Sequence, residues 1–423
     1  MPNRARAPRT FPVRHIDFPV VQELRLDNGF PLLVLHSDTQ EVTRVDVVFH
    51  AGRPYEQKNL VARATAAQIR EGTRKHTSAE VAEHFDYYGS EFSAPFQLDT
   101  ANLSLVALNK HLESVLPVFS EILHSPAFPE AELAHFIQRN QQKLLVDLSQ
   151  NDVIAYRQIT EMIFGSAHPY GYNSTPDMYA ALTSADLQAH HQRTYSANNG
   201  VVFASGWVDE HAIRLLNDTL GQAVPGGVEA TPLIPVSDSM PVRQRLHHPR
   251  SQQTAIRIGR RLFNRHHPDY HKMYVVNTLL GGYFGSRLMS SIREEKGYTY
   301  NIYSSLECMR FDGYFYIATE TGNEVAEKAL QQIYEEIAGM QEHLVSQKEL
   351  NLAKNYLLGG MLSQIDGPFN TMDLVRSLTL ESLDLSFFQE AVAAIREITP
   401  EEVRDLARKY LGRDQMWEIL VGA

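Results

Sequence analysis

The 423-residue sequence predicts an α+β protein of two homologous domains, each a largely antiparallel sheet with helices packed on one face. Three observations support this fold class. The composition, with 43% hydrophobic and 21% charged residues, is that of a globular chain and excludes a disordered or fibrous one. Strand and helix patterns are mixed within each half, as in α+β domains. Finally, the order of elements recurs after about half of the chain.

The first half begins with a strand and continues with helices. Residues 44–50 alternate between apolar and polar side chains, which is typical of a half-buried strand. Helices are predicted at about residues 59–70 and at 78–87, and a pair of strands between residues 91 and 107. A longer helix is predicted at 132–148.

The ends of the two halves show the repeat most clearly. Residues 183–195 and 399–410 each begin with a capping Thr and carry an acidic residue three positions later. An apolar strand that ends in Gly follows each of these helices, and both the Thr pair and the Gly pair are 216 residues apart. The helices predicted to open at Glu132 and Glu349 are 217 residues apart. A repeat of this length indicates a duplicated domain and not a solenoid.

The boundary between the domains is predicted near the middle of the chain. Residues 222–241 contain four prolines and a glycine pair, a composition typical of a linker. The two domains are therefore expected at residues 1–221 and 242–423.

Composition also restricts the kind of partner and site. The net charge of −11 disfavours binding to nucleic acid. Cys308 is the single cysteine, so the chain can form neither an intramolecular disulfide nor a cysteine-built zinc site. No apolar run is long enough for a membrane span. The N-terminal segment is basic, and charged residues follow it where a secretory signal would have an apolar run. We therefore expect a cytoplasmic protein without nucleic-acid or membrane partners.

One segment carries a specific resemblance. Residues 60–73, Leu-Val-Ala-Arg-Ala-Thr-Ala-Ala-Gln-Ile-Arg-Glu-Gly-Thr, resemble the first zinc-binding helix of the insulinase/pitrilysin family, the inverzincin metallopeptidases. In that family the helix carries His-x-x-Glu-His and ends in Gly-Thr. Counting back from Gly-Thr places the three motif positions at Arg63, Ala66 and Ala67. Arginine does not ligate Zn²⁺, and alanine supplies neither a ligand atom nor a general base.

The third zinc ligand of the family is a Glu on the next long helix. Residues 138–146 contain no Glu, and Lys143 lies close to the expected place. The resemblance therefore implies that every position of the zinc site is lost and that this chain binds no cofactor of its own.

Three other groups invite a metal interpretation, which we consider weak for each. Residues 80–84, Glu-Val-Ala-Glu-His, lack the leading His and are read as the polar face of a helix. His266, His267 and His271 surround Pro268, and the last two would align on a helix; a solvated helix start is the simpler interpretation. For the pair at residues 190–191 we expect a surface or packing role.

The resemblance covers the chain from about Leu24 to the C-terminus. Residues 168–171 and 183–206 match the later N-domain pattern of the family, and residues 279–282 and 286–297 match its C-domain signature. The glycines at 281 and 282 lack the order of a phosphate-binding loop and are predicted to form a turn between helices.

The C-domain signature contains the remaining chemistry. Arg293 and Tyr300, seven residues apart, resemble an Arg–Tyr pair that faces the zinc site from the opposite domain in catalytic members of the family. There the Tyr hydroxyl donates to the oxyanion on the scissile carbonyl, and the Arg holds a neighbouring carbonyl. Tyr298 is the alternative, because it is two residues from Tyr300 on a predicted strand. Without the resemblance, a helix-capping Arg and a core Tyr would be the preferred interpretation.

Half of a catalytic apparatus is thus expected and half is absent. The bacterial two-domain branch of the family contains heterodimers in which each chain forms half of a clamshell around extended peptides. The resemblance implies that this chain is the zinc-free subunit of such a metalloendopeptidase, with zinc in a homologous partner and short or unfolded peptides as substrates. The alternatives are a non-catalytic scaffold and a peptide-binding homodimer.

Overall fold

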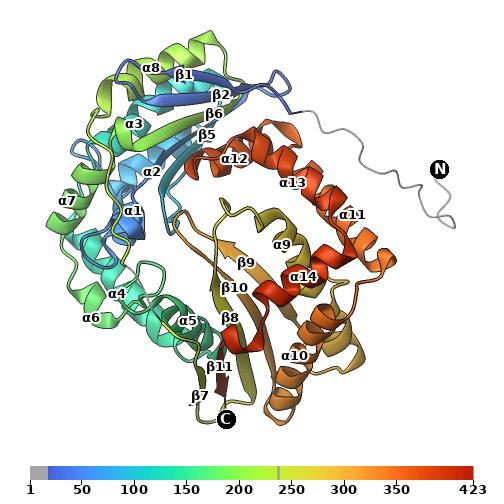
Figure 1. The fold of residues 1–423 in the computed structure, drawn as a ribbon. Helices are drawn as coiled ribbons and strands as arrows, with labels where there is room; N and C mark the ends of the chain where they lie inside the picture. Colours follow the sequence, from blue (N-terminus) through green and yellow to red (C-terminus); the bar gives the residue numbers. More distant parts are fainter. Residues whose placement is uncertain (1–17, 236–238, 423) are drawn as a thin grey trace, which may run out of the picture.

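The computed structural model describes residues 18–235 and 239–422 (Figure 1). The prediction that the N-terminal segment is not a secretory signal concerns residues outside these ranges. Within them, the chain forms two sheets of similar topology, each with its own helices, so the predicted fold class is confirmed. None of the helices in these ranges combines the length and the apolar character that a membrane span requires.

The first half contains a six-stranded sheet in the order β1-β2-β6-β3-β5-β4, antiparallel except between β2 and β6. Its strands are β1 (Gln22–Arg25), β2 (Pro31–His36), β3 (Val42–Phe49), β4 (Glu91–Ser93), β5 (Ala101–Leu108) and β6 (Gly200–Gly206). Its helices are α1 (Val61–Gln68), α2 (Ser78–Tyr87), α3 (Leu112–His124), α4 (Glu130–Asp147), α5 (Asn151–Phe164), α6 (Pro176–Ala180), α7 (Ser184–Thr194) and α8 (Glu210–Ala223).

The second half contains a five-stranded sheet in the order β7-β11-β8-β10-β9, antiparallel except between β7 and β11. Its strands are β7 (Arg243–His247), β8 (Gln253–Leu262), β9 (Ile302–Cys308), β10 (Gly313–Gly322) and β11 (Trp417–Gly422). Its helices are α9 (Tyr270–Asn277), α10 (Ala326–Glu342), α11 (Gln347–Ser363), α12 (Gly367–Leu380), α13 (Leu385–Glu397) and α14 (Pro400–Tyr410), with two π-helical segments, η4 (Thr278–Gly282) and η5 (Met289–Glu295).

The internal repeat is visible in the element order. Helices α5 and α12 begin 216 residues apart, and so do α7 and α14. Both α7 and α14 begin with the expected capping box, in which the capping Thr and the acidic residue three positions later bond to each other's backbone N–H groups. Between Ala223 and Arg243, the described residues contain neither helix nor strand.

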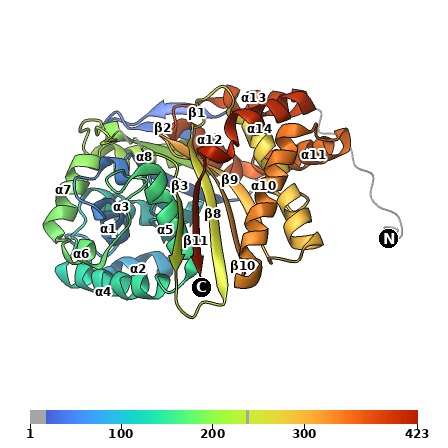
Figure 2. The same ribbon diagram turned by 60° about the horizontal axis from the view of Figure 1, so that its bottom comes forward.

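The two halves exchange helices, an arrangement that was not predicted. Each sheet carries helices of its own half on one face. The other face of the second sheet is covered by α5 of the first half, through Ala155, Ile159 and Ile163 (Figure 2). In return, α12 of the second half packs on the first sheet through Met372 and Val375. Each half therefore supplies part of the other half's core.

Ion pairs reinforce this exchange in both directions. Arg44 on β3 contacts Asp373 on α12 at 2.8 Å, and Arg376 on α12 contacts the buried Asp46 on β3 at 3.2 Å. The ring closes because Arg44 also contacts Asp46, at 3.0 Å, and Arg376 contacts Asp373, at 2.9 Å. Where α5 packs on the second sheet, the buried Arg257 of β8 pairs with Asp152 of α5.

Candidate functional site

The first zinc-motif position lies on α1 and faces α4. The Arg63 guanidinium donates a long hydrogen bond of 3.4 Å to the side-chain oxygen of Asn140, while Ala66 is buried and Ala67 packs against the core. Lys143 lies close to the place where the third ligand is expected, and it pairs with Asp147 of its own helix at 2.6 Å.

Zinc does not fit this donor set. A guanidinium, two methyl groups and one neutral amide oxygen provide none of the imidazole, thiolate or carboxylate ligands that Zn²⁺ requires. No group of three or more His, Cys, Asp or Glu within residues 18–235 and 239–422 is arranged to hold a metal ion.

Helix α1 is nevertheless firmly positioned. Its N-cap, Leu60, has a left-handed conformation with φ of 71°, and its N–H donates to the hydroxyl of Tyr172 at 3.2 Å. That hydroxyl donates to Glu56 at 2.6 Å, and the other Glu56 oxygen accepts from the N–H of Ala62 at 3.1 Å. Burial raises the pKa of Glu56, although the hydrogen bond from Tyr172 opposes this shift. These contacts fix the start of α1, although its zinc-motif positions carry no ligands.

The Glu-Val-Ala-Glu-His segment at residues 80–84 has a structural role. Glu80 closes the capping box of α2 with Thr77, and the ring of His84 contacts the carbonyl oxygen of Ser114 at 3.0 Å. The predicted polar helix face is confirmed.

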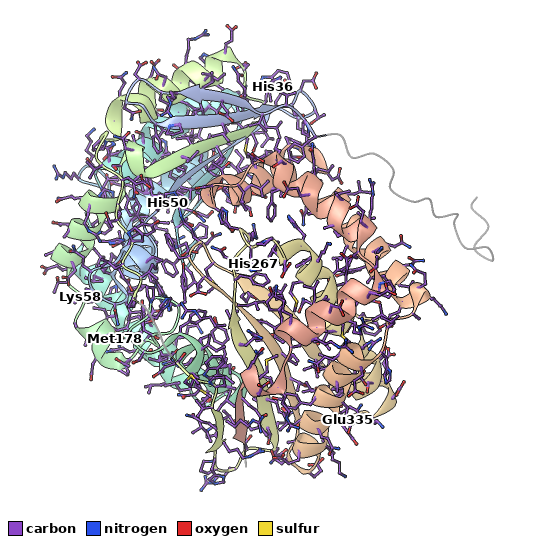
Figure 3. The ribbon with its side chains drawn as sticks, viewed as in Figure 1. His36, His50, Lys58, Met178, His267 and Glu335 are labelled. Carbon is purple, nitrogen blue, oxygen red and sulfur yellow. The ribbon has the colours of Figure 1, made fainter. Side chains whose placement is uncertain are left out.

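The second histidine group is arranged differently from the expected helical alignment. His267 precedes α9, which begins at Tyr270, and it stacks on Phe263 at 3.9 Å between ring centroids. His271 lies on α9 and packs on Phe387. The two rings therefore face different partners, because Pro268 delays the start of the helix. Figure 3 labels three histidines: His36 ends β2, His50 follows β3, and His267 lies in the loop before α9.

His190 and His191 are buried, as a packing role requires. Their rings contact the carbonyl oxygens of Ala51 and Leu123 at 3.0 and 2.8 Å. Burial lowers the pKa of each imidazole to about 4, so both are neutral at pH 7.

We expect these two histidines to make stability depend on pH. The folded-state pKa lies below that of the unfolded chain, so the stability is present above pH 6.5 and is lost as pH falls towards 4. Between pH 7.5 and pH 5, each histidine should cost about 2 kcal/mol. Urea unfolding of His191→Gln at both pH values should show a loss smaller than that of the wild type by this amount. His135→Gln, which changes an exposed histidine of α4, is the control. Equal losses in the wild type and His191→Gln would contradict the assignment.

The Arg–Tyr segment lies outside the core. Arg293 is on the π-helix η5, a rare conformation that occurs often at functional sites. The predicted strand over Tyr298 and Tyr300 is wrong, because Gly297 turns the chain with φ of 65° and β9 begins only at Ile302. Tyr298 packs against the core of the second half, whereas Tyr300 is 91% exposed. The two tyrosines therefore do not share a face, and Tyr300 is not a core residue.

Arg293 and Tyr300 line one cavity of about 600 Å³, together with Tyr298 and Thr321. The Arg293 guanidinium lies over the ring of Phe284, 4.9 Å from its centroid. Within the described residues, the side chains of Arg293 and Tyr300 form no hydrogen bond or ion pair with protein groups. Their polar groups are thus available to a ligand or to another chain.

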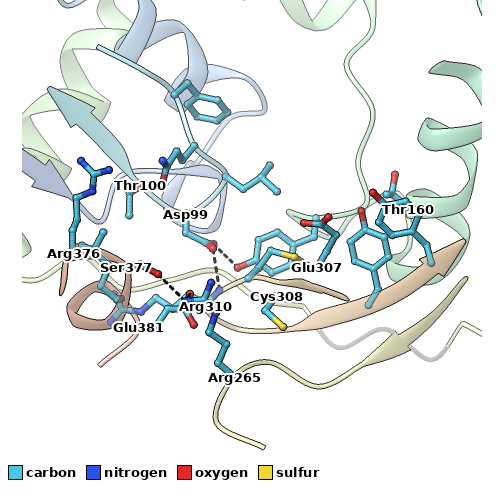
Figure 4. A pocket seen from close by; sticks show the side chains of 18 of the residues that line it. Asp99, Thr100, Thr160, Arg265, Glu307, Cys308, Arg310, Arg376, Ser377 and Glu381 are labelled. Atoms are coloured by element: carbon cyan, nitrogen blue, oxygen red, sulfur yellow. Dashed lines mark hydrogen bonds and ion pairs between the residues drawn. The ribbon is translucent and has the colours of Figure 1, made fainter. Parts of the chain in front are cut away.

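A second cavity, of about 690 Å³, lies between the two halves and was not predicted (Figure 4). Asp99, in the loop between β4 and β5, accepts hydrogen bonds from the hydroxyl of Tyr170 and from the N–H of Arg310, the latter at 3.0 Å. The Arg310 guanidinium donates to the ring of His50 at 2.6 Å and to the carbonyl oxygen of Leu380 at 2.9 Å.

These contacts shift the pKa of two groups. Burial raises the pKa of Asp99, and burial together with the charge of Arg310 lowers the pKa of His50 to about 3. A short motif does not reveal this network, but the internal repeat offers a signal, since Asp99 and Arg310 lie in equivalent hairpin loops of the two halves.

Two family models match the chain. The model described as "Insulinase (Peptidase family M16)" matches residues 32–163, and "Peptidase M16 inactive domain" matches residues 181–357. The "Uncharacterized zinc protease YmxG" of Bacillus subtilis is 20% identical over 399 residues, which cover 93% of this chain and 97% of that protein. The "Non-peptidase homolog YmxG" of Helicobacter pylori is 22% identical over 375 residues, covering 86% and 85%. A crystal structure of a peptidase M16 inactive domain from Pseudomonas fluorescens is 26% identical, with a TM-score of 0.88 and coverage of 95% and 98%.

Proposed function

Because this chain belongs to the insulinase family of M16 peptidases, we propose that it is the zinc-free, cytoplasmic subunit of a heterodimeric zinc metalloendopeptidase that degrades peptides. A homologous partner supplies the zinc ion and the general base. This chain contributes Arg293 and Tyr300, and the two chains together enclose the substrate.

One observation carries the proposal. Tyr300 is 91% exposed. Among the described residues, the Arg293 side chain has no polar partner and lies over the ring of Phe284, although both Arg293 and Tyr300 lie on a cavity wall. Leaving a tyrosine and an arginine without polar partners gains nothing for the stability of the isolated chain. The pair is therefore suited to bind groups of a substrate or of another chain. A zinc ion would have to come from another chain too, because Arg63, Ala66 and Ala67 provide no zinc ligands.

The chemistry of the pair follows from its donors. In the complex, the Tyr300 hydroxyl donates to the oxyanion that develops on the scissile carbonyl, and Arg293 donates to a neighbouring carbonyl of the peptide. Both donors hold the peptide in position while the partner carries out hydrolysis.

Substitution of Tyr300 by Phe tests this role. We expect kcat of the reconstituted complex to fall by about 100-fold, as on loss of an oxyanion donor. The exposed position of Tyr300 predicts an unchanged fold. Peptide hydrolysis by the complex with the zinc-bearing partner is the measurement, and Tyr298→Phe is the matched control. An unchanged kcat for Tyr300→Phe would refute the role.

A non-catalytic scaffold is the second candidate, and a peptide-binding homodimer is a variant of it. The Helicobacter pylori relative, named as a non-peptidase homolog, favours this group of functions. Co-purification separates the candidates. An active peptidase partner supports the heterodimer, a non-peptidase assembly supports the scaffold, and a self-associating chain that binds peptide without cleavage supports the homodimer.

A further inference from the structure

Phe284 is an exposed aromatic residue in the turn between η4 and η5. Its exposed fraction is 62%, so the ring contributes little to the core of the second half. The guanidinium of Arg293 lies over this ring, 4.9 Å from the centroid. A cation at this distance from the face of an aromatic ring is attracted by the quadrupole of the ring. The exposed ring therefore has a specific contact, and that contact is with Arg293.

The turn that carries Phe284 is anchored to α11 on both sides of this residue. Before it, the ring of Tyr283 stacks on that of Tyr356, with 5.0 Å between the centroids. After it, Arg287 donates two hydrogen bonds, of 2.7 and 3.0 Å, to the carboxylate of Glu349. A bidentate pair of this kind fixes orientation as well as distance. The backbone that presents Phe284 is thus held in place independently of Arg293.

The backbone of Arg293 is fixed as well, so the freedom that remains is in its side chain. The preceding residue, Ile292, is fully buried, and its carbonyl oxygen accepts a hydrogen bond of 3.0 Å from the N–H of Tyr298. An arginine side chain without partners samples many rotamers, and this freedom is lost when the side chain binds a ligand. A contact that restricts the rotamers beforehand reduces this loss.

We propose that Phe284 is a positioning residue, which holds the guanidinium of Arg293 ready to bind a carbonyl oxygen of the peptide. The inference rests on the proposed function, because it concerns the hydrogen-bond donor that Arg293 supplies there. A ring face accepts the positive charge without occupying the N–H donors, whereas a carboxylate in the same place would compete with the peptide for them. The aromatic ring is therefore a suitable support for a guanidinium that must remain free to donate.

Phe284→Leu in the reconstituted complex tests this role, because leucine is apolar but has no ring. The carbonyl that Arg293 binds is present in the substrate and in the transition state, so KM should rise about 3- to 5-fold with kcat unchanged. The split is opposite to that expected for Tyr300→Phe. Phe284→Tyr keeps the ring and should retain the KM of the wild type. Hydrolysis of an internally quenched fluorogenic peptide gives both constants.

Two comparisons make the test specific. Tyr87→Leu removes a ring that is 81% exposed on α2 and should change neither constant. In an Arg293→Ala background, Phe284→Leu should have no further effect on KM, because the residue acts through Arg293. The same increase in both backgrounds would mean that Phe284 contacts the peptide itself and would overturn the inference. A KM unchanged by Phe284→Leu, or raised equally by Phe284→Tyr, would also overturn it.

The contact can be measured on the isolated full-length chain, which separates the inference from the proposed function. With isotope-labelled arginine, the side-chain resonance that disappears in Arg293→Lys belongs to this residue. We expect this resonance to carry a ring-current shift that Phe284→Leu removes and Phe284→Tyr keeps. A shifted resonance in a chain that completes no peptidase would support the positioning and reject the heterodimer. An active complex whose zinc-free subunit shows an unshifted Arg293 resonance would do the reverse.

Discussion

Replacing Asp46 by Ala is expected to lower the free energy of unfolding by about 3–5 kcal/mol. Asp46 is 2% exposed, lies on β3 of the first half, and contacts both Arg44 and Arg376. Its removal leaves two largely buried guanidinium groups with Asp373 as their remaining carboxylate. An unpaired buried charge costs far more than a surface ion pair contributes.

Urea unfolding of the whole chain measures this effect. Asp46→Asn, which keeps the shape but removes the charge, should show a large part of the loss. Asp405→Ala is the matched control, since Asp405 forms an exposed ion pair with Arg404, and it should cost less than about 1 kcal/mol. A loss below about 1 kcal/mol for Asp46→Ala would show that the ring of ion pairs does not hold the halves together.

Local signals in the sequence predicted several of the elements. The helix predicted at 78–87 is α2, and its capping Thr77 and Glu80 fix its start through short-range contacts. The repeat was recognisable for the same reason, because caps and apolar strands are encoded by neighbouring residues and recur at a fixed spacing.

The sequence misled where a non-local contact decides the conformation. Tyr298, Thr299 and Tyr300 favour a strand by residue type. In the structure, Gly297 turns the chain, and the Thr299 hydroxyl binds the carbonyl oxygens of Asn301 and Glu320. These contacts hold the segment off the sheet and leave Tyr300 exposed. Periodicity likewise shows that α5 has an apolar face, but it does not tell which sheet covers that face.

The candidate site could be predicted only in part. Arg293, Tyr300 and the lost zinc positions were found through resemblance, and the structure places the pair in one cavity. Glu320 and Glu324, which line the same cavity, belong to no motif, because residues distant from Arg293 in the sequence reach this cavity only through the fold. The contact between Arg310 and His50 spans 260 residues and depends on how the two halves meet.

The exchange of α5 and α12 leads to the second large effect. We expect neither half to fold when the chain is divided at residue 236 and each part is produced alone. The first half would expose the apolar face of α5 and lose the cover that α12 gives to Phe203. The second half would lose the cover of α5 over Ala318 and Ile419. Burial of each of the larger apolar side chains stabilises the fold by about 1.5–3 kcal/mol. This is a large share of the free energy of unfolding of a domain.

Co-expression of the two parts should restore a soluble one-to-one complex that unfolds cooperatively, because the exchanged helices and the ring of ion pairs around Asp46 need no covalent link. Ile159→Asp on α5 should abolish the complex, since Ile159 is fully buried against the second half. Gln158→Asp, at a half-buried position of the same helix, is a milder matched change. Size-exclusion chromatography and thermal unfolding report both results. If the first part alone eluted as a monomer with a sharp unfolding transition, its sheet would not depend on α12, and the exchange would be a contact between two independently stable domains instead of a shared core.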